Sequence, residues 1–269
     1  MSNFSIDSEN NLFRKFIPTN KFQHEVDMSK GAYEMASETE LFDTPIIKEI
    51  NSEKNEIDFE LLEEITTLRA HFISNFAYSS SAKQLSEFKQ LFSRIGKSLN
   101  LIHSGKKYFE GISRTTFPDG FFKADFNKDL VYIHGDFTLS NLLYGKNNKL
   151  FIIDWNTSPV YGFSASCGPR YWDLSFFISS LFYFSISTFF SFKVRKELAK
   201  EFLSGYLKES DLDTEEFLKE FSEFLNSYNY YKLYDSIYKS NKSVSEKLLI
   251  IYTKNRLNNF IVSLPDLLK

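Results

Sequence analysis

Residues 134–141 of the chain read His-Gly-Asp-Phe-Thr-Leu-Ser-Asn, and residues 152–155 read Ile-Ile-Asp-Trp. These two stretches present, in order, a carboxylate at Asp136, an amide at Asn141 and a second carboxylate at Asp154. Which chemistry the three polar side chains can perform depends on whether the fold brings them together.

The segment between Asn141 and Asp154 predicts that these two residues meet. Residues 145–148 read Gly-Lys-Asn-Asn, a turn signal that lies between the apolar runs Leu-Leu-Tyr and Leu-Phe-Ile. The second run is typical of a buried strand, and it delivers Asp154 at its end. A hairpin here would fold the amide and the carboxylate back toward each other, close enough to share one cation.

The spacing of the polar residues indicates phosphoryl transfer. Asp136 and Asn141 are separated by four residues, the interval found in kinase catalytic loops between the Asp that takes the acceptor proton and the Asn that binds magnesium. An Asp that follows a Gly can also serve only as a turn former. In combination, however, Asp136 is predicted as the catalytic carboxylate, and Asn141 and Asp154 as ligands of Mg²⁺, which prefers oxygen donors.

These residues resemble the signature of the aminoglycoside phosphotransferase and choline kinase family. Further similarity lies at residues 95–103, Ile-Gly-Lys-Ser-Leu-Asn-Leu-Ile-His, and at residues 168–174, Gly-Pro-Arg-Tyr-Trp-Asp-Leu. The resemblance covers most of residues 10–190. It implies a protein-kinase-like fold, ATP and Mg²⁺ as cofactors and a small-molecule hydroxyl as substrate. It also implies structural roles for His134 and for Asp173, which would support the catalytic loop from the start of a buried helix or serve only as its N-cap.

The expected fold class is α+β, with an abbreviated mixed N-lobe over residues 1–62 and a mainly helical C-lobe over residues 63–269. In the N-lobe, apolar patterning predicts a helix over 21–37. The predicted strands of this lobe are 3–7, 12–17, 46–50 and 56–61. Helices of the C-lobe are predicted over 64–77, 83–104, 173–190, 193–208, 213–226 and 243–262.

A kinase-like N-lobe requires a lysine that contacts the ATP phosphates. Lys15 is the best candidate, and Glu25 on the following helix is its expected ion-pair partner. Arg14 and Glu34 are the substitutes if this register is wrong, and all of these residues could instead be solvated surface charges. Residues 59–62 fit the connection between the lobes, where backbone groups of Glu60 and Leu62 would bind the adenine edge.

The beginning of the chain departs from the family pattern. Lobes of this kind normally start with a hairpin, often glycine-rich, that covers the ATP phosphates. Here fourteen residues precede Lys15, and the first glycine is Gly31. This leaves room for one strand before the lysine strand. Either the phosphate side of the site is more open, another segment or subunit closes it, or the chain is a degenerate enzyme or starts late.

Composition restricts the class of protein. The formal charge of −3 and the pI near 5.9 argue against nucleic acid as a partner. A single cysteine excludes an intramolecular disulfide framework, and no signal peptide is evident at the N-terminus, so we expect a cytoplasmic protein. Residues 174–192 carry no charge and are expected to form a core helix, with association to a membrane or partner as the alternative.

The acceptor is the least constrained part of the prediction. We expect a sugar, a glycan precursor or an amino alcohol. Tyrosines at 228–238 could stack on a sugar ring or cover an ammonium group, but core packing explains them as well. The acids between residues 209 and 223 are typical of a solvated helix face. Alternatives are a pseudokinase or binding module that works through a partner, a kinase of lipid-linked glycans, and a protein kinase. The protein kinase is disfavoured because no Ala-Pro-Glu follows Asp154.

Overall fold

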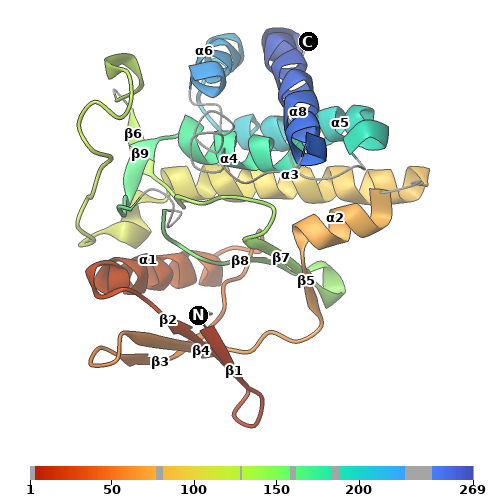
Figure 1. Cartoon of the computed structure of the whole chain (residues 1–269). Coiled ribbons are helices and arrows are strands. Elements are labelled where there is room, and N and C mark those ends of the chain that lie inside the picture. The colour runs from red at the N-terminus through yellow and green to blue at the C-terminus, as the bar shows by residue number, and fades with distance from the viewer. Residues whose placement is uncertain are drawn as a thin grey trace. The chain divides into compact units, whose positions relative to one another are not determined.

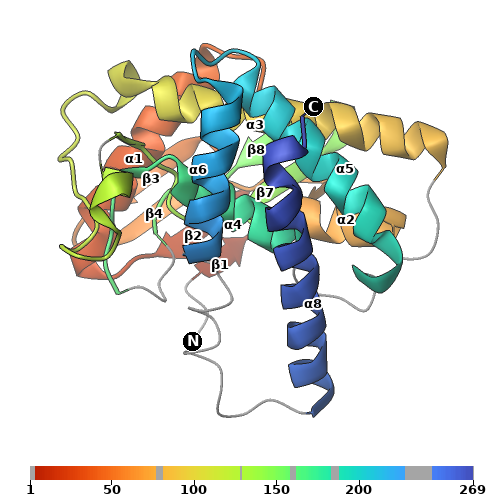
Figure 2. The same cartoon turned by 90° about the horizontal axis from the view of Figure 1, so that it is seen from above.

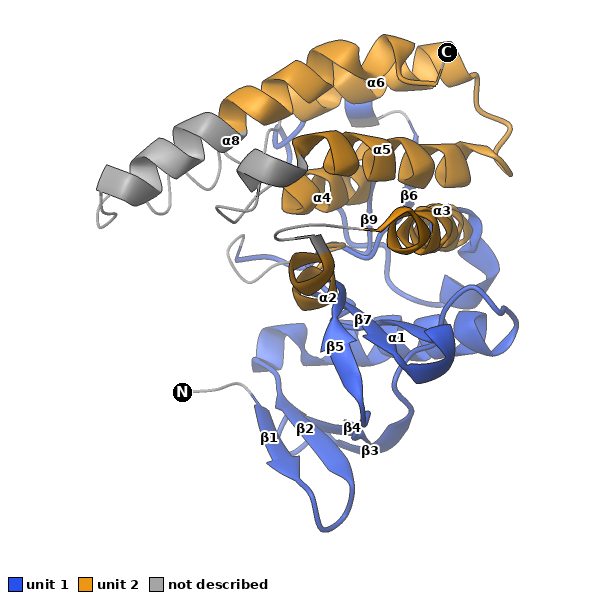
Figure 3. Cartoon of the chain, turned by 90° about the vertical axis from the view of Figure 1, so that its right-hand side faces the viewer, with its two compact units in different colours: residues 1–68, 102–136, 140–170 blue, residues 69–101, 137–139, 171–269 orange. Residues whose placement is uncertain are grey.

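A computed structural model describes residues 4–76, 81–127, 129–157, 162–182, 188–227 and 244–268. Contacts divide the chain into two compact units (Figure 3). Unit 1 comprises residues 1–68, 102–136 and 140–170, and unit 2 comprises residues 69–101, 137–139 and 171–269. The predicted lobe boundary after residue 62 remains a prediction.

Unit 1 begins with a four-stranded antiparallel sheet in the order β1-β2-β4-β3 (Figure 1). Its strands are β1 (Phe4–Asp7), β2 (Leu12–Phe16), β3 (Ile47–Asn51) and β4 (Glu56–Glu60). Helix α1 (Thr19–Ser37) connects the two halves of the sheet and packs on one face. The predicted order of strand, strand, helix and two strands is confirmed, with one strand before the strand that carries Lys15.

Side chains of this sheet separate into two faces because successive residues of a strand point in opposite directions. Ile57, with Phe22 and Val26 of α1, forms the core between the sheet and the helix. Gly31 lets α1 approach the 3₁₀ helix η1 (Lys106–Phe109), since a Cβ atom there would lie 2.6 Å from the carbonyl oxygen of Tyr108.

The predicted hairpin is present in unit 1. Strands β7 (Leu142–Gly145) and β8 (Leu150–Ile152) pair antiparallel, with Leu142 opposite Ile152. The turn between them (η3, Lys146–Asn148) places asparagines 147 and 148 at φ of 59° and 60°, a left-handed conformation that asparagine tolerates. Strand β5 (Ile65–Thr67) adds to the edge of β7.

The remaining elements of unit 1 are short. Strands β6 (Leu130–Tyr132) and β9 (Cys167–Pro169) form a two-stranded antiparallel sheet, and η2 covers Ala124–Asn127.

Unit 2 is helical. Its elements are α2 (Leu68–Phe76), α3 (Ala82–Ser104), α4 (Tyr171–Phe182), α5 (Thr188–Leu207), α6 (Thr214–Ser227), α8 (Val244–Ser263) and η5 (Leu264–Asp266). Helices α6 and α8 lie side by side (Figure 2). Phe177 of α4 stacks on Phe202 of α5 at 4.0 Å between ring centroids and contacts Phe92 of α3 edge-on at 5.5 Å. Aromatic packing of this kind accounts for much of the chain's high phenylalanine content.

The α+β prediction is confirmed, whereas two helix predictions need correction. Residues 65–67, Ile-Thr-Thr, form a strand rather than the start of a helix over 64–77, because β-branched side chains favour the extended backbone. Of the helix predicted over 173–190, residues up to Phe182 are described as α4 and residues 183–187 lie outside the described residues, while a separate helix, α5, begins at Thr188 rather than at 193. Residues 174–182 are nearly all buried in unit 2, as expected for a core helix. No helix of the described residues is long and apolar enough to cross a membrane. The tyrosines at 228–238 lie outside the described residues.

Candidate active site

Lys15 forms ion pairs with two carboxylates of unit 1. It is on β2, directly opposite Ile57 of β4, so its side chain projects from the face that packs on α1. Its Nζ donates to Glu25 of α1 and, at 2.6 Å, to Oδ1 of Asp154. Burial lowers the pKa of Lys15, but the charges and hydrogen bonds of Asp154 and Glu25 outweigh it and hold the pKa above its ordinary value. The lysine is therefore a fixed cation between two carboxylates.

The register of the lysine strand distinguishes Lys15 from the alternative Arg14. The Arg14 guanidinium points to the opposite face of the sheet, where it donates to both carboxylate oxygens of Asp58 at 2.7 and 2.6 Å. Glu34, the alternative acid, is exposed on α1. Of the two predicted pairs, the structure brings together Lys15 and Glu25.

The β7–β8 hairpin brings Asn141 and Asp154 to the same end of the sheet. The ladder continues past Leu142, with the N–H of Ile153 donating to the carbonyl oxygen of Asn141 at 3.0 Å. Asp154 then adopts a φ of 62°, unusual for a residue with a side chain and frequent at functional sites. Its side chain remains about half exposed and lines a pocket.

Asp136 is held by the amide of Asn141. The Nδ2 atom of Asn141 donates to the backbone oxygen of Asp136 at 2.9 Å and to its Oδ2 at 3.2 Å. Gly135 precedes the carboxylate with a φ of 92°, and a Cβ atom there would lie 2.8 Å from the backbone nitrogen of Thr157. The glycine of this motif is thus required by backbone conformation and by close packing.

The ring of His134 is hydrogen-bonded to backbone groups through both of its nitrogens. Its Nδ1 accepts the backbone N–H of Asp136 at 3.2 Å, and its Nε2 lies 2.9 Å from the carbonyl oxygen of Ile153. Because a carbonyl can only accept, Nε2 carries the proton and donates. The ring also packs on Trp155, with centroids 4.9 Å apart. His134 therefore ties the loop of Asp136 to the strand that ends at Asp154.

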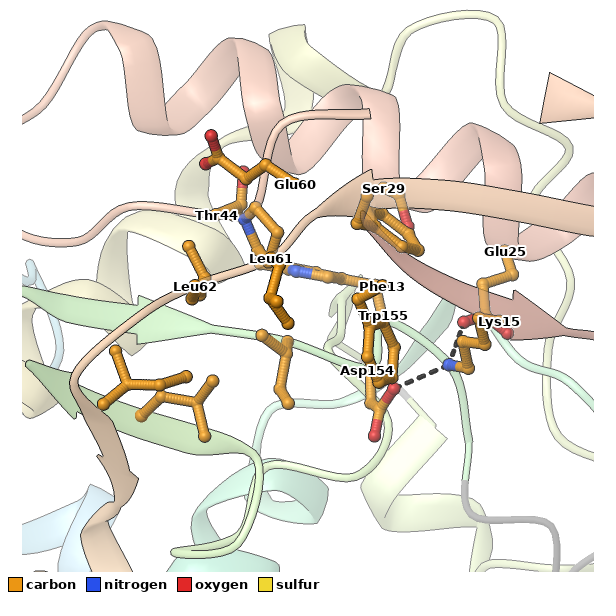
Figure 4. A pocket seen from close by; sticks show the side chains of 15 residues that line it. Phe13, Lys15, Glu25, Ser29, Thr44, Glu60, Leu61, Leu62, Asp154 and Trp155 are labelled. Carbon is orange, nitrogen blue, oxygen red and sulfur yellow. Dashed lines mark hydrogen bonds and ion pairs between the residues drawn. The ribbon is translucent and has the colours of Figure 1, made fainter. Parts of the chain in front are cut away.

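An open pocket of about 800 Å³, including the space at its mouth, adjoins Lys15 and Asp154. Figure 4 shows Lys15 and Glu25 toward one end of this pocket, and Thr44, Glu60 and Leu62 toward the other. Between them the wall is mostly apolar. The lining residues are Phe13, Lys15, Glu25, Ser29, Thr44, Pro45, Phe59, Glu60, Leu61, Leu62, Ile65, Leu143, Ile153, Asp154 and Trp155. A pocket with a cation at one end, an apolar middle section and polar groups at the other end suits a ligand with an anionic tail and an aromatic base that has a polar edge.

Comparison with solved structures shows that the fold of this chain is similar to that of known kinases. The solved structure of amicoumacin kinase hAmiN in complex with AMP-PNP, Ca²⁺ and Ami matches with a TM-score of 0.54 and 14% sequence identity, covering 98% of this chain and 84% of that chain. The chain therefore has a kinase-like fold. The predicted resemblance is therefore confirmed at the level of the fold.

Two further structures are more distant. A choline/ethanolamine kinase family protein from Mesorhizobium loti matches with a TM-score of 0.48 and 12% identity, covering 95% of this chain and 86% of that chain. Choline kinase LicA from Streptococcus pneumoniae matches with a TM-score of 0.47 and 16% identity, covering 94% and 86%. No protein-family model and no curated protein sequence matches the chain.

The polar residues of this kinase-like fold suit a hard cation. Since Asn141 donates through Nδ2, its amide oxygen points away from Asp136, and the carboxylate of Asp154 stands on the adjoining strand end. No group of three His, Cys, Asp or Glu side chains in the described part of the chain could hold a metal by itself.

The remaining predicted residues are placed as follows. Glu60 and Leu62 both line the pocket, and the Glu60 side chain accepts the backbone N–H of Ile46 at 3.2 Å. Asp173 is fully buried in unit 2, in the first turn of α4 rather than before it, because the helix begins at Tyr171.

Several residues of the pocket wall were not predicted from the sequence. Phe13 and Leu143 could have been found, since each lies two residues from a predicted site residue and shares its face of a strand. Ser29 and Thr44 carry no comparable sequence signal. Thr44 lies in the irregular segment before β3, whose path depends on tertiary contacts.

Proposed function

We propose that this protein is an ATP- and Mg²⁺-dependent phosphotransferase that acts on a hydroxyl group of a small molecule. The observation that supports it best is the joint placement of Lys15, Glu25 and Asp154 beside an apolar pocket. Asp136 and Asn141 adjoin them through the hairpin. The likeness to small-molecule kinases adds to the proposal as a likeness of fold.

Each side chain has a role in the proposed reaction. Lys15, positioned by Glu25, binds the phosphates of the nucleotide, and the backbone at Glu60 and Leu62 binds the edge of the base. Asn141 and Asp154 would hold Mg²⁺, which neutralises charge on the phosphates when bound. Asp136 orients the acceptor hydroxyl and receives its proton.

The substrate class is proposed as a sugar, a glycan precursor or an amino alcohol. This substrate class is tested by screening candidate acceptors for acceptor-dependent release of ADP by the purified protein. Amicoumacin is included in the screen because the structural neighbour is an amicoumacin kinase.

The Asp136→Ala variant provides the blank for this screen. We expect it to lower turnover by about 10²- to 10⁴-fold, the usual contribution of a general base. Its affinity for ATP, measured by calorimetry, should stay close to that of the wild type, since Asp136 does not line the pocket. Asp119→Ala removes an exposed acid from unit 1 and is the matched control.

Full activity in Asp136→Ala would contradict the mechanism. Absence of ATP binding by the wild-type protein at millimolar nucleotide would instead favour the binding-module alternative.

A further inference from the structure

Thr44 is a polar residue in the wall of the pocket that the proposed mechanism does not use. Its side chain is 7% exposed and lines the pocket beside Pro45. Its Oγ1 is buried and makes no hydrogen bond to any residue that the structure describes. A buried hydroxyl without a partner is unfavourable, so such groups usually have a partner in the functional state.

The backbone fixes where Thr44 lies. On one side, Asp43 is tied to β8: its N–H donates to the carbonyl of Leu150 at 2.8 Å, and its carbonyl accepts from Ile152 at 3.0 Å. On the other side, the carbonyl of Ile46 accepts the N–H of Glu60 at 2.9 Å. Thr44 is therefore held between the strand that leads to Asp154 and the segment that leads to Leu62.

This position is at the end of the pocket away from Lys15 (Figure 4). A nucleotide with its phosphates at Lys15 extends its base into the apolar section, with the polar edge of the base toward Glu60 and Thr44. The N–H of Leu61 already donates to the carbonyl of Asn11 at 3.0 Å. The N–H of Glu60 is used as well, since it donates to the carbonyl of Ile46 at 2.9 Å. The backbone of this segment thus has two donors fewer for the base, and a side-chain hydroxyl can supply another contact.

We propose that the Thr44 hydroxyl binds the substituent at position 6 of the purine base, which makes Thr44 a base-binding residue of the nucleotide site. The proposal rests on the proposed function. A rotation of 120° about χ1 moves Oγ1 to another of the three staggered positions on Cβ, so the proposed contact requires a change of rotamer and no backbone movement. A hydroxyl both donates and accepts, so it serves a 6-amino or a 6-oxo group equally.

The test compares two nucleotides in the presence of Mg²⁺: ATP and purine riboside 5′-triphosphate, which has no substituent at position 6. Calorimetry on the wild type should show tighter binding of ATP. Thr44→Val, which replaces the hydroxyl with a methyl group, should reduce this preference about fivefold, as expected for one neutral hydrogen bond. Thr44→Ser should retain it, and so should Thr116→Val, which alters an exposed threonine of the same unit.

Unfolding without nucleotide provides a second readout. Thr44→Val should be at least as stable as the wild type, because the substitution removes an unpaired buried hydroxyl. Two results would overturn the proposal: an unchanged preference for ATP in Thr44→Val, or an equal loss of affinity for both nucleotides. Failure of the wild type to bind either nucleotide would overturn the proposed function itself. Calorimetry on the wild type detects this failure before any Thr44 variant is compared.

Discussion

Lys15 and Arg14 are adjacent basic residues that have different partners because they project from opposite faces of one strand. Arg14 neutralises Asp58, a buried carboxylate on the outer face of the sheet. Lys15 neutralises Glu25, which is 4% exposed, and reaches Asp154 at the pocket. Each cation keeps a buried acid from being left without a counter-charge, but only one of them faces the proposed nucleotide.

Substitution of the two residues should therefore separate stability from binding. Lys15→Met leaves Glu25 buried and unpaired, and we expect it to lower the free energy of unfolding by about 1–3 kcal/mol. ATP affinity should fall by about 10- to 100-fold, the value of a charge-assisted hydrogen bond. Urea unfolding and calorimetry measure the two effects.

Arg14→Met is the matched control for this experiment. It should also lower stability, because Asp58 loses its partner, while ATP affinity remains near that of the wild type. Equal losses of affinity in both variants would refute the assignment of Lys15 to the phosphates. The double variant Lys15→Met/Glu25→Gln should regain part of the stability, since the unpaired charge is removed, but none of the affinity.

The placement of individual residues could be predicted from the sequence where local spacing determines it. Asp136, Asn141 and Asp154 belong to two short motifs, and their proximity follows from one turn signal between them. Thr44 and Ser29 could not be predicted in this way, because their place in the wall depends on how α1 and the segment before β3 pack on the sheet.

At the scale of elements, α1 links the proposed site to the rest of unit 1. It carries Glu25 near its start and contacts η1 through Gly31 near its middle. Farther along, Glu38 accepts hydrogen bonds from Lys107 at 2.7 Å and from the hydroxyl of Tyr108 at 2.6 Å. These bonds hold the pKa of Glu38 below its ordinary value. The position of the helix is thus set by contacts distant from the pocket.

Gly31→Ala tests this dependence. Alanine favours a helix over glycine by about 1 kcal/mol. The added Cβ would nevertheless meet the Tyr108 carbonyl at 2.6 Å and the Phe109 ring at 2.7 Å. We expect a net loss of about 1–3 kcal/mol in urea unfolding, as for other overpacked sites, and weaker ATP binding as α1 shifts Glu25. Lys30→Ala, on the exposed side of the same helix, should change stability by less than about 0.5 kcal/mol. A Gly31→Ala variant with a higher free energy of unfolding than the wild type would contradict this prediction, because it would show that η1 can move away from the added Cβ without loss of stability.

Helices and strands could be predicted where turn-forming residues in the sequence mark their ends. The β7–β8 hairpin is an example, because glycine and two asparagines mark the turn between two apolar runs. Strand β5 was missed because three residues are too short for a periodic pattern. Residues 174–192 contain no glycine, proline or charge, so nothing in them indicated that α4 and α5 are separate helices.

At the scale of the whole molecule, the two compact units are interleaved along the chain. The chain passes from one unit to the other after residues 68, 101, 136, 139 and 170. The single lobe boundary predicted after residue 62 stays a prediction, and the compact units are a separate division of the chain by contacts. The later return of residues 102–136 and 140–170 to unit 1 could not be read from composition or periodicity, since it depends on pairings between segments distant in sequence.

Such interleaving predicts that the two units unfold together. The chain has two tryptophans, one in each unit: Trp155 in unit 1 and Trp172 in unit 2. In Trp172→Phe the fluorescence reports unit 1, and in Trp155→Phe it reports unit 2. Within each variant, the urea midpoint from fluorescence should coincide with the midpoint from far-UV circular dichroism, which reports the whole chain. ATP with Mg²⁺ should then raise both midpoints of Trp172→Phe together, by mass action on the folded state. A fluorescence midpoint separated from the dichroism midpoint, or a nucleotide effect confined to Trp155, would show that unit 1 unfolds on its own despite its five connections to unit 2.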